Sequence, residues 1–433
     1  MSDWPYEKLG KLCDRVSVGH VGPTSEYFCG RGEGVALVRS QNVRPGRLTL
    51  EDVAYITPDF HSSLKKSQLR PGDVLVVRVG QNRGDVCRVP DGWTGPLNCA
   101  NVVFARPREI DSRFLELYLR SSAGQASLIS MTTGSAQGVL NTRSVAEVAV
   151  PVPPLHVQQR IANLLGAIDD KIEQNRRTGA KLEGLARAVF KAWFVDFEPV
   201  KAKAAGATAF PGMPPETFDA LPTGFDDSEV GPVPDGWVVG KLGENAHINK
   251  SSVRTGQIDG EIEYVDIASV SVGQLGGVQV TSFADAPSRA RRRVYHGDTI
   301  WSCVRPNRRS YLFIHSPPSN RIVSTGFAVI SPKVLGAAYI YEATTQQEFV
   351  DYLVANADGS AYPAVRAEHF ACANVLIPPQ VVRDAFEKVA MPLRDFIAAG
   401  DKESAKLATL RDYLLPRLLS GQVRVGEGRT HDH

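Results

Sequence analysis

A seven-residue apolar repeat between residues 155 and 193 is the longest regular pattern in the chain. No proline interrupts residues 155–198, and charged residues separate the apolar ones. One register consists of Ile161, Ile168, Asn175, Leu182 and Val189, and the alternate register consists of Leu165, Ile172, Gly179, Ala186 and Trp193. A seam of this period favours a long helix that packs against a partner helix rather than into a globular core. We therefore predict a long helix over residues 155–198.

The chain itself supplies a partner helix, 225 residues further on. Pro153 and Pro154 correspond at this offset to Pro378 and Pro379. The corresponding seam is Phe386, Leu393, Gly400, Leu407 and Leu414, with Ala390, Ile397, Ser404, Arg411 and Leu418 in the alternate register. We predict a second long helix over residues 380–422, with Pro392 inside it, and expect the two helices to pair as a coiled-coil hairpin.

The same offset of 225 relates three further motifs upstream of the helices. Gly72-Asp73 becomes Gly297-Asp298, Val79, Asn82 and Arg83 become Val304, Asn307 and Arg308, and Gly134-Ser135-Ala136 becomes Gly359-Ser360-Ala361. One offset over several separated motifs indicates a tandem duplication, in which each copy is a globular domain followed by a long helix. The predicted parts are a first domain (1–154), its helix (155–198), a linker (199–233), a second domain (234–379), its helix (380–422) and a disordered tail (423–433).

Each globular domain is expected to mix strands and helices, so the fold class is α+β with two tandem α/β domains. In the first copy, strands are predicted over 35–38, 74–77, 86–89, 101–105 and 145–152, with a helix over 113–131. In the second, strands are predicted over 299–304, 311–315, 327–330 and 373–377, with a helix over 337–356. Trp4 and Trp237 are expected to be buried at the start of each domain. The proline-rich linker is expected to hold no helix or central strand.

Composition narrows the class of protein without naming a partner. The chain has 433 residues, 43% of them hydrophobic, and a net charge of only +2, so any basic surface must be local. Its six cysteines lack zinc-binding spacing and suggest reduced thiols. The N-terminus has no apolar signal core, and no run approaches eighteen apolar residues. A cytoplasmic protein without a membrane segment is expected.

Two polar loops are the best candidates for binding chemistry. The P-loop, HExxH and amino-methyltransferase motifs are absent, which favours a binding protein over an enzyme. The first loop carries Arg78, Gln81, Asn82 and Arg83, and the second, arginine-rich segment carries Arg292, Arg293, Arg305, Asn307, Arg308 and Arg309. Arginine reads guanine and neutralises phosphate, and asparagine or glutamine reads adenine. A solvated polar hairpin remains the alternative for each loop.

The glycine-serine loops are a second set of candidates. Ser135 and Gln137 in the first copy, and Ser360 and Tyr362 in the second, offer hydroxyl and amide groups beside flexible backbone. A helix end with glycine as its C-cap explains the same glycines equally well.

The layout resembles the specificity subunits of Type I restriction-modification systems. The resemblance rests on the strand from Gly72 to Val77, the loop from Gly134, and the run VPVPPLHVQQRIANLLGAIDDKIEQN from Val150. FKAWFVDFEPV from Phe190 and FDDSEVGPVPDGW from Phe225 are also similar to that family. The second helix departs from the pattern, because it begins QVVRDAF instead of an LxEQxxI-type run.

The resemblance implies that each domain is a target recognition domain for one half of a bipartite double-stranded DNA target. The two helices would pack antiparallel around a pseudo-twofold, space the domains, and dock two methyltransferase subunits, which restriction/translocase subunits would join. The chain itself would be non-catalytic and hold no cofactor, with S-adenosylmethionine, Mg²⁺ and ATP used only by the partner subunits. Two alternatives remain open, a coiled-coil adaptor without sequence-specific DNA binding and an enzyme with an unrecognised site.

Overall fold

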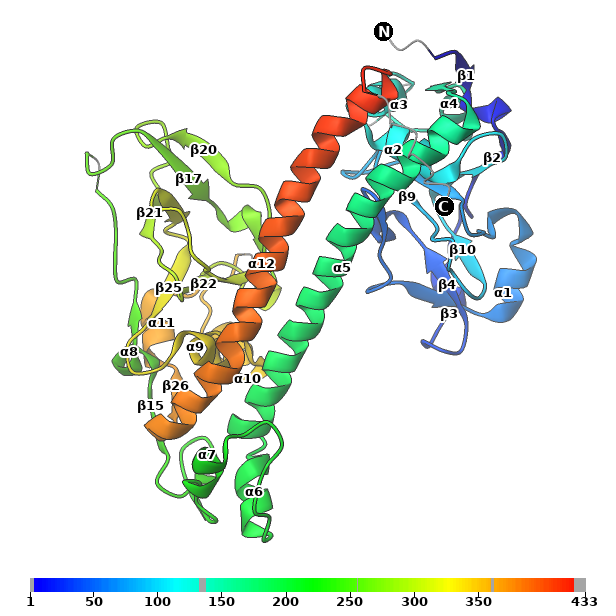
Figure 1. Ribbon diagram of the computed structural model, residues 1–433. Coiled ribbons are helices and arrows are strands. Elements are labelled where there is room, and N and C mark those ends of the chain that lie inside the picture. The colour runs from blue at the N-terminus through cyan, green and yellow to red at the C-terminus, as the bar shows by residue number, and fades with distance from the viewer. Residues whose placement is uncertain (1–3, 132–137, 255, 360–361, 424–433) are drawn as a thin grey trace, which may run out of the picture. The chain divides into compact units, whose positions relative to one another are not determined.

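The computed structural model describes residues 4–131, 138–254, 256–359 and 362–423. The chain forms two compact units (Figure 1). Unit 1 comprises Met1–Gln174 and Glu403–His433, and unit 2 comprises Asn175–Lys402. The boundary therefore falls within each of the two long helices, α5 (Leu155–Phe194) and α12 (Gln380–Leu419). Each unit contains one end of both helices.

Unit 1 is built on two four-stranded sheets. The first has the order β2 (Cys13–Val18), β11 (Val102–Pro107), β8 (Val74–Val77), β9 (Val86–Arg88), and all its pairings are antiparallel. The second has the order β10 (Leu97–Cys99), β4 (Val35–Val38), β7 (Ala54–Ile56), β3 (Phe28–Cys29). Smaller pairs are β1 (Tyr6–Lys8) with β12 (Ala149–Pro151), and β5 (Val43–Arg44) with β6 (Arg47–Leu48).

Helices cover one face of the first sheet in unit 1. They are α2 (Ser112–Arg120), α3 (Ser122–Ser130) and α4 (Thr142–Ala146), and α1 (Pro58–Ser63) lies beside the second sheet. The main core joins sheet residues such as Val74 and Val103 to Leu115 of α2, Leu165 of α5 and Leu418 of α12. The ends of both long helices are thus part of the hydrophobic core of this domain, which anchors them by burial of apolar surface.

Unit 2 repeats this plan. Its first sheet has the order β16 (Ala246–Ile248), β25 (Phe327–Pro332), β22 (Thr299–Ser302), β23 (Tyr311–Phe313), again antiparallel. Its second sheet has the order β20 (Gln279–Ser282), β17 (Glu261–Val265), β24 (Arg321–Ser324), β21 (Ala290–Arg293). Smaller pairs are β13 (Phe225–Asp226) with β14 (Val233–Pro234), β15 (Val238–Lys241) with β26 (Asn374–Ile377), and β18 (Val270–Ser271) with β19 (Gln274–Leu275).

Three helices of unit 2 stand at the places expected from the duplication, α9 (Ala337–Thr345), α10 (Gln347–Ala355) and α11 (Ala367–Cys372). The short helix α8 (Leu242–Asn245) has no helix 225 positions earlier in unit 1. An offset of 225 maps Ser112–Arg120 onto Ala337–Thr345 and Leu155–Phe194 onto Gln380–Leu419. The core joins Trp301 and Tyr339 to Phe190 and Trp193 of α5 and Phe386 of α12. The fold class is therefore the predicted one, two α/β domains that are each followed by a long helix.

A shared turn explains the repeated Gly-Asp motif. Gly72 and Gly297 have φ values of +83° and +87°, a left-handed conformation that favours glycine. The Asp73 carboxylate accepts the amide N–H of Arg70 at 2.8 Å, and the Asp298 carboxylate accepts that of Tyr295 at 2.7 Å. Each aspartate thereby closes the turn that leads into β8 or β22, so the motif is structural in both copies.

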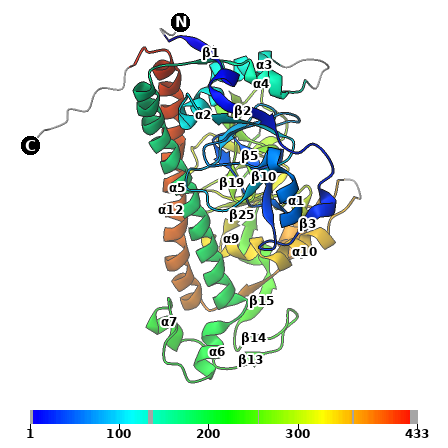
Figure 2. The ribbon, with the colours of Figure 1, turned by 90° about the vertical axis from the view of Figure 1, so that its right-hand side faces the viewer.

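In each unit the long helices lie side by side and run antiparallel (Figure 1, Figure 2). The seam residues Ile161, Leu165 and Phe386 are buried, and Ile168, Ile172, Leu182, Val189, Leu393, Ile397, Leu407 and Leu414 are half-buried. Partial burial is expected away from the domains, because two helices alone leave one side of each seam open. The helix α12 continues through Pro392 without a break.

Three local predictions were wrong. The helices predicted over 113–131 and 337–356 are each two helices, because Ser121 and Gln346 have extended ψ values of 160° and 157°. The Ser121 hydroxyl accepts the Gly124 amide N–H at 3.1 Å and so starts a new helix. The strand predicted over 145–152 is shorter, since α4 occupies its first residues and β12 begins at Ala149.

The linker was also expected to lack helices, and this was wrong. It contains α6 (Glu198–Ala204) and α7 (Pro215–Asp219), each with a proline in its first turn, where the missing N–H costs no hydrogen bond. Val200, Phe218 and Leu221 are buried in the core of unit 2. Trp237 is buried as predicted, whereas Trp4 is only half-buried. Within the described ranges, no helix combines the length and the apolar character needed to cross a membrane.

Candidate nucleic-acid interface

The first candidate loop is a tight hairpin between β8 and β9. Gly80 and Gly84 have φ values of +89° and +91°, which let the chain reverse direction over few residues. The Gly84 amide N–H donates to the Val77 carbonyl at 2.9 Å and closes the hairpin. Gln81 is exposed at the tip, and Asn82 beside it is half-buried. The loop therefore presents an amide side chain on a short, backbone-bonded support.

Two arginines of this loop make hydrogen bonds within their own domain. The Arg83 guanidinium donates to the Gly138 carbonyl at 2.6 Å, and the Arg78 carbonyl accepts the Leu140 amide N–H at 3.1 Å. Both arginines are half-buried. The loop is thus tied to the segment that follows the glycine-serine loop, and Arg83 has a positioning contact in addition to any contact with a ligand.

The second candidate loop joins β22 to β23 and has a less common backbone. Arg305 and Arg309 both adopt the left-handed conformation, with φ values of +51° and +55°. Non-glycine residues seldom occupy this region, and such strained residues cluster at functional sites. The single helical turn between them carries Asn307 and Arg308, and both side chains are exposed.

Arg305 and Tyr362, predicted from separate segments, meet in the structure. The Arg305 guanidinium carbon lies 4.5 Å from the centre of the Tyr362 ring, and the Arg305 amide N–H donates to the Pro363 carbonyl at 2.7 Å. The Tyr362 side chain is 70% exposed. Stacking between a cation and an aromatic ring is stabilising at such a distance. The pair places a half-buried cation, in the loop that also carries Asn307, against an exposed aromatic ring.

The other arginines of the second copy have different environments. The Arg309 guanidinium donates a hydrogen bond to the Gln347 side chain at the start of α10, and this bond holds the loop against that helix. Arg292 and Arg293 are on β21, opposite Val323 and Ile322 of β24, and not in the loop as the sequence suggested. Burial lowers the pKa of Arg292.

The arginine-rich segment also contains an acidic residue, Asp298, but this residue does not neutralise the positive charge of the loop at the surface. Asp298 is only 2% exposed and closes the turn described above. Burial raises the pKa of Asp298, against the hydrogen bond from the Tyr295 amide. The exposed part of the loop therefore keeps its positive charge. Ser135, Gln137 and Ser360, which were also predicted, lie outside the described residues.

An aromatic patch in unit 1 was missed from the sequence. Tyr27 and Phe60 stack with ring centres 3.7 Å apart, and Arg39 lies 5.6 Å from the centre of the Phe28 ring. Tyr27 and Phe28 are 39% and 41% exposed. Two adjacent aromatic residues next to a glycine-rich loop were a signal that could have been used. Such surfaces stack on bases in many nucleic-acid-binding proteins.

Comparison with known proteins agrees with this architecture. Residues 62–183 match the family model described as the Type I restriction modification DNA specificity domain. This segment runs from before β8 into the long helix α5. It therefore contains the first candidate loop.

Relatives of known class align over most or all of the chain. The Type I restriction enzyme HindI specificity subunit of Haemophilus influenzae is 22% identical over 98% of this chain and 100% of its own length. The MjaIX specificity subunit of Methanocaldococcus jannaschii is 25% identical over 73% of this chain and 70% of its own length. The crystal structure of the Type I restriction-modification S subunit from M. genitalium has the same fold, with a TM-score of 0.57 at 14% identity over 99% of this chain and 97% of that one. Residues 62–183 thus match the DNA specificity domain of Type I restriction-modification systems, the chain as a whole is similar in sequence to Type I specificity subunits, and it shares the fold of a solved S subunit.

Proposed function

We propose that the chain is the non-catalytic subunit that gives a Type I restriction-modification complex its DNA sequence specificity, with each domain reading one half of a bipartite target. One observation carries this proposal. The same hairpin, between equivalent strands of two copies of one scaffold, exposes different polar side chains, Gln81 in one copy and Asn307 with Arg308 in the other. The equivalents of Asn307 and Arg308 in the first copy, Asn82 and Arg83, are the same residue types but are half-buried. A duplicated scaffold with divergent loops suits the recognition of two different half-sites.

The chemistry of the exposed groups suits base and phosphate contacts. Glutamine and asparagine pair bidentately with adenine, and arginine with guanine, in the major groove. Arg308 can also neutralise a backbone phosphate, and the Arg305–Tyr362 pair can stack on a base or sugar. The bonds that Arg83 and Arg309 make within the domains hold the loops in place, and pre-organised loops lose less entropy on binding.

The long helices are proposed to space the two domains and to dock two methyltransferase subunits. Leu185 on α5 and Leu410 on α12 are related by the offset of 225, and they are 50% and 46% exposed. Exposed leucines at equivalent positions of two helices support two equivalent binding sites, because large apolar side chains at a surface often mark interfaces. Restriction/translocase subunits are proposed to join this complex on DNA.

In this proposal the chemistry belongs to the partners. The methyltransferase subunits use S-adenosylmethionine, the translocating subunits use ATP and Mg²⁺, and this chain holds no cofactor. Its contribution is the choice of the DNA sequence at which the partners act.

The experiment that tests the proposal is selection from a random duplex library by the chain in complex with the methyltransferase subunits of its own system. We expect an enriched motif with two short specified blocks separated by an unspecified gap of fixed length. Enrichment of one continuous block would contradict the hypothesis that each domain recognises a separate half-site. Absence of any enriched sequence, with intact methyltransferase binding, would favour an adaptor without sequence-specific DNA binding.

A further inference from the structure

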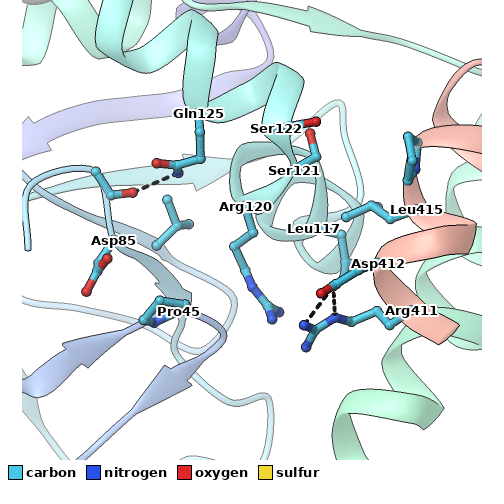
Figure 3. A pocket seen from close by; sticks show the side chains of 13 residues that line it. Pro45, Asp85, Leu117, Arg120, Ser121, Ser122, Gln125, Arg411, Asp412 and Leu415 are labelled. Atoms are coloured by element: carbon cyan, nitrogen blue, oxygen red, sulfur yellow. Dashed lines mark hydrogen bonds and ion pairs between the residues drawn. The ribbon is translucent and has the colours of Figure 1, made fainter. Parts of the chain in front are cut away.

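Each unit contains a buried ionic network that joins its domain to both long helices. In unit 1, Asp169 of α5 lies at the centre. Its carboxylate oxygens accept one hydrogen bond from Arg120 of α2 at 2.8 Å and one from Arg411 of α12 at 2.7 Å. Their side chains are only 11–19% exposed. Figure 3 shows that Arg120 of α2 and Arg411 of α12 line the same pocket.

The charge on Asp169 is stabilised in this setting. Burial alone would raise the pKa of Asp169, but Arg120 and Arg411 outweigh that effect and hold the pKa below its ordinary value. The aspartate is therefore ionised at neutral pH and makes two charge-assisted hydrogen bonds.

In unit 2 the corresponding network has the opposite sign. Arg394 of α12 lies at its centre, paired with Glu342 of α9 and Glu183 of α5. Arg394 also stacks on the Tyr341 ring at 4.1 Å from its centre, and the Tyr341 hydroxyl donates to Glu183 at 3.0 Å. The Arg394 side chain is 4% exposed and that of Glu342 is fully buried.

The two centres are equivalent residues of the duplication. Asp169 and Arg394 are 225 positions apart, and the helices α2 and α9 that face them are equivalent as well. In the contacts that these networks make across the helix pair, α5 contributes the acids Asp169 and Glu183, and α12 contributes the bases Arg411 and Arg394. The pair Lys171–Glu403 has the reverse polarity, but both of its side chains are more than 40% exposed, and exposed ion pairs contribute little. An inverted charge at an equivalent buried position distinguishes the first helix from the second.

We propose that these inverted networks are a pairing code, which makes the first long helix accept the second helix and reject another copy of itself. Two chains that meet in solution each carry both helices, and the duplicated seams alone would allow first-with-first and second-with-second pairing. The inference concerns assembly of the chain and does not depend on the proposed DNA recognition.

The offset shows what incorrect pairing would bring together. A second first-copy helix in the place of α12 would put Asp169 where Arg394 stands, against Glu183. A second α12 in the place of α5 would put Arg394 where Asp169 stands, against Arg411. Like charges at a buried contact are strongly unfavourable, and such repulsion is how paired helices gain partner specificity. The intended pair has opposite charges at both positions.

The middle of the helix pair provides a reporter of which helices are paired. Asn175 donates its side-chain amide to the Gly400 carbonyl at 3.3 Å, and these residues are equivalent in the duplication. A Cβ atom added to Gly400 would lie 3.6 Å from the Asn175 Cβ, a distance within the range of about 3.5–4.5 Å found in disulfides. The full chain with Asn175→Cys and Gly400→Cys should therefore form a 175–400 link within one chain. Pairing between like copies would instead give 175–175 and 400–400 links between two chains.

The test adds Glu183→Arg and Arg411→Glu to this reporter chain. Both changes create repulsion in the intended pair, and both create attraction in the pairs of like copies. We expect the ratio of interchain to intrachain links, mapped by mass spectrometry over a protein concentration series, to rise at least about tenfold, which corresponds to a difference of about 1.4 kcal/mol. The matched control carries Glu183→Gln and Arg411→Gln, which remove the same ion pairs without creating attraction between like copies.

Equal link ratios in the switched chain and the glutamine control would overturn the proposal. Loss of the ion pairs would then account for the whole change in the link ratio, with no contribution from attraction between like copies. A fully inverted chain keeps the test decisive if the switched chain folds poorly. It carries Arg120→Glu, Asp169→Arg, Glu183→Arg, Glu342→Arg, Arg394→Glu and Arg411→Glu, so the four pairs that Asp169 and Arg394 make in the two networks are again of opposite sign. We expect it to regain the intrachain 175–400 link. An inverted chain that still forms mainly interchain links would also refute the code.

Discussion

Replacing Glu342 by glutamine should remove a pH-dependent loss of stability from unit 2. The Glu342 side chain is fully buried, and one of its oxygens, Oε2, has no hydrogen-bond partner among the described residues. Arg394 is the cation that contacts it, and Glu183 shares that cation. Burial raises the pKa of Glu342 from 4.5 to about 7, against the attraction of Arg394. Glutamine keeps the shape of the protonated acid and cannot ionise.

The direction and size of the effect follow from this shift. The protonated carboxyl is compatible with the folded protein, so the favourable contribution is complete below pH 4.5 and is lost as the pH rises through about 7. The shift spans about 2.5 pH units, and each unit is worth about 1.4 kcal/mol, so full ionisation costs unit 2 about 3 kcal/mol. Glu342→Gln should match the parent chain near pH 5 and be more stable by up to that amount at pH 8.5.

Chemical denaturation at pH 5, 7 and 8.5 would measure this difference, with the exposed Glu348→Gln on the neighbouring helix as a control for the loss of one charge. Other buried acids also titrate, so the informative quantity is the difference between the variant and the parent at each pH. The same difference at all three pH values would refute the reasoning. A variant that loses stability more steeply as the pH rises would refute its sign.

Three further predictions concern recognition and assembly. Arg83→Ala should weaken DNA binding by about 1–3 kcal/mol and speed hydrogen exchange in the segment after Gly138, whereas loss of a base contact alone would leave exchange unchanged. Insertion of one heptad after Asn175 and another after Gly400 adds about 10 Å to the helix pair and should widen the preferred gap between half-sites by about three base pairs in a binding ladder. Methyltransferase subunits should bind two to one by native mass spectrometry, and Leu185→Asp should reduce this to one to one while the chain stays folded by circular dichroism.

The long helices could be predicted because their signal is local and repeated. A seven-residue period from Ile161 to Val189, found again 225 residues later, indicates helices and their pairing without any tertiary information. The breaks at Ser121 and Gln346 were missed because each is a change of backbone conformation at one residue, which leaves no periodic signal in the sequence; at Ser121 the side chain also caps the next helix, and at Gln346 it does not. The helices of the linker were missed because prolines were treated as breakers, although Pro199 and Pro215 stand in first turns, where proline is tolerated.

The sequence predicted which loops carry the candidate residues, but it did not predict which contacts their side chains make. The sequence placed Arg83 and Arg309 in the loops, yet their bonds to Gly138 and Gln347 join residues far apart in the chain. The approach of Arg305 to Tyr362 is also non-local, since 57 positions separate them. Residue type and spacing nominate polar loops, but packing decides which side chains stay available to a ligand.

The measurement that tests the central claim most directly is a comparison of selected DNA motifs for two loop variants. One variant carries Gln81→Ala and Asn82→Ala, and the other carries Asn307→Ala and Arg308→Ala, each in complex with the methyltransferase subunits. We expect each variant to lose sequence preference in a different block of the bipartite motif and to leave the other block and the gap unchanged. If either variant relaxed both blocks equally, or neither block at all, these loops would not be the parts of the two domains that read separate half-sites.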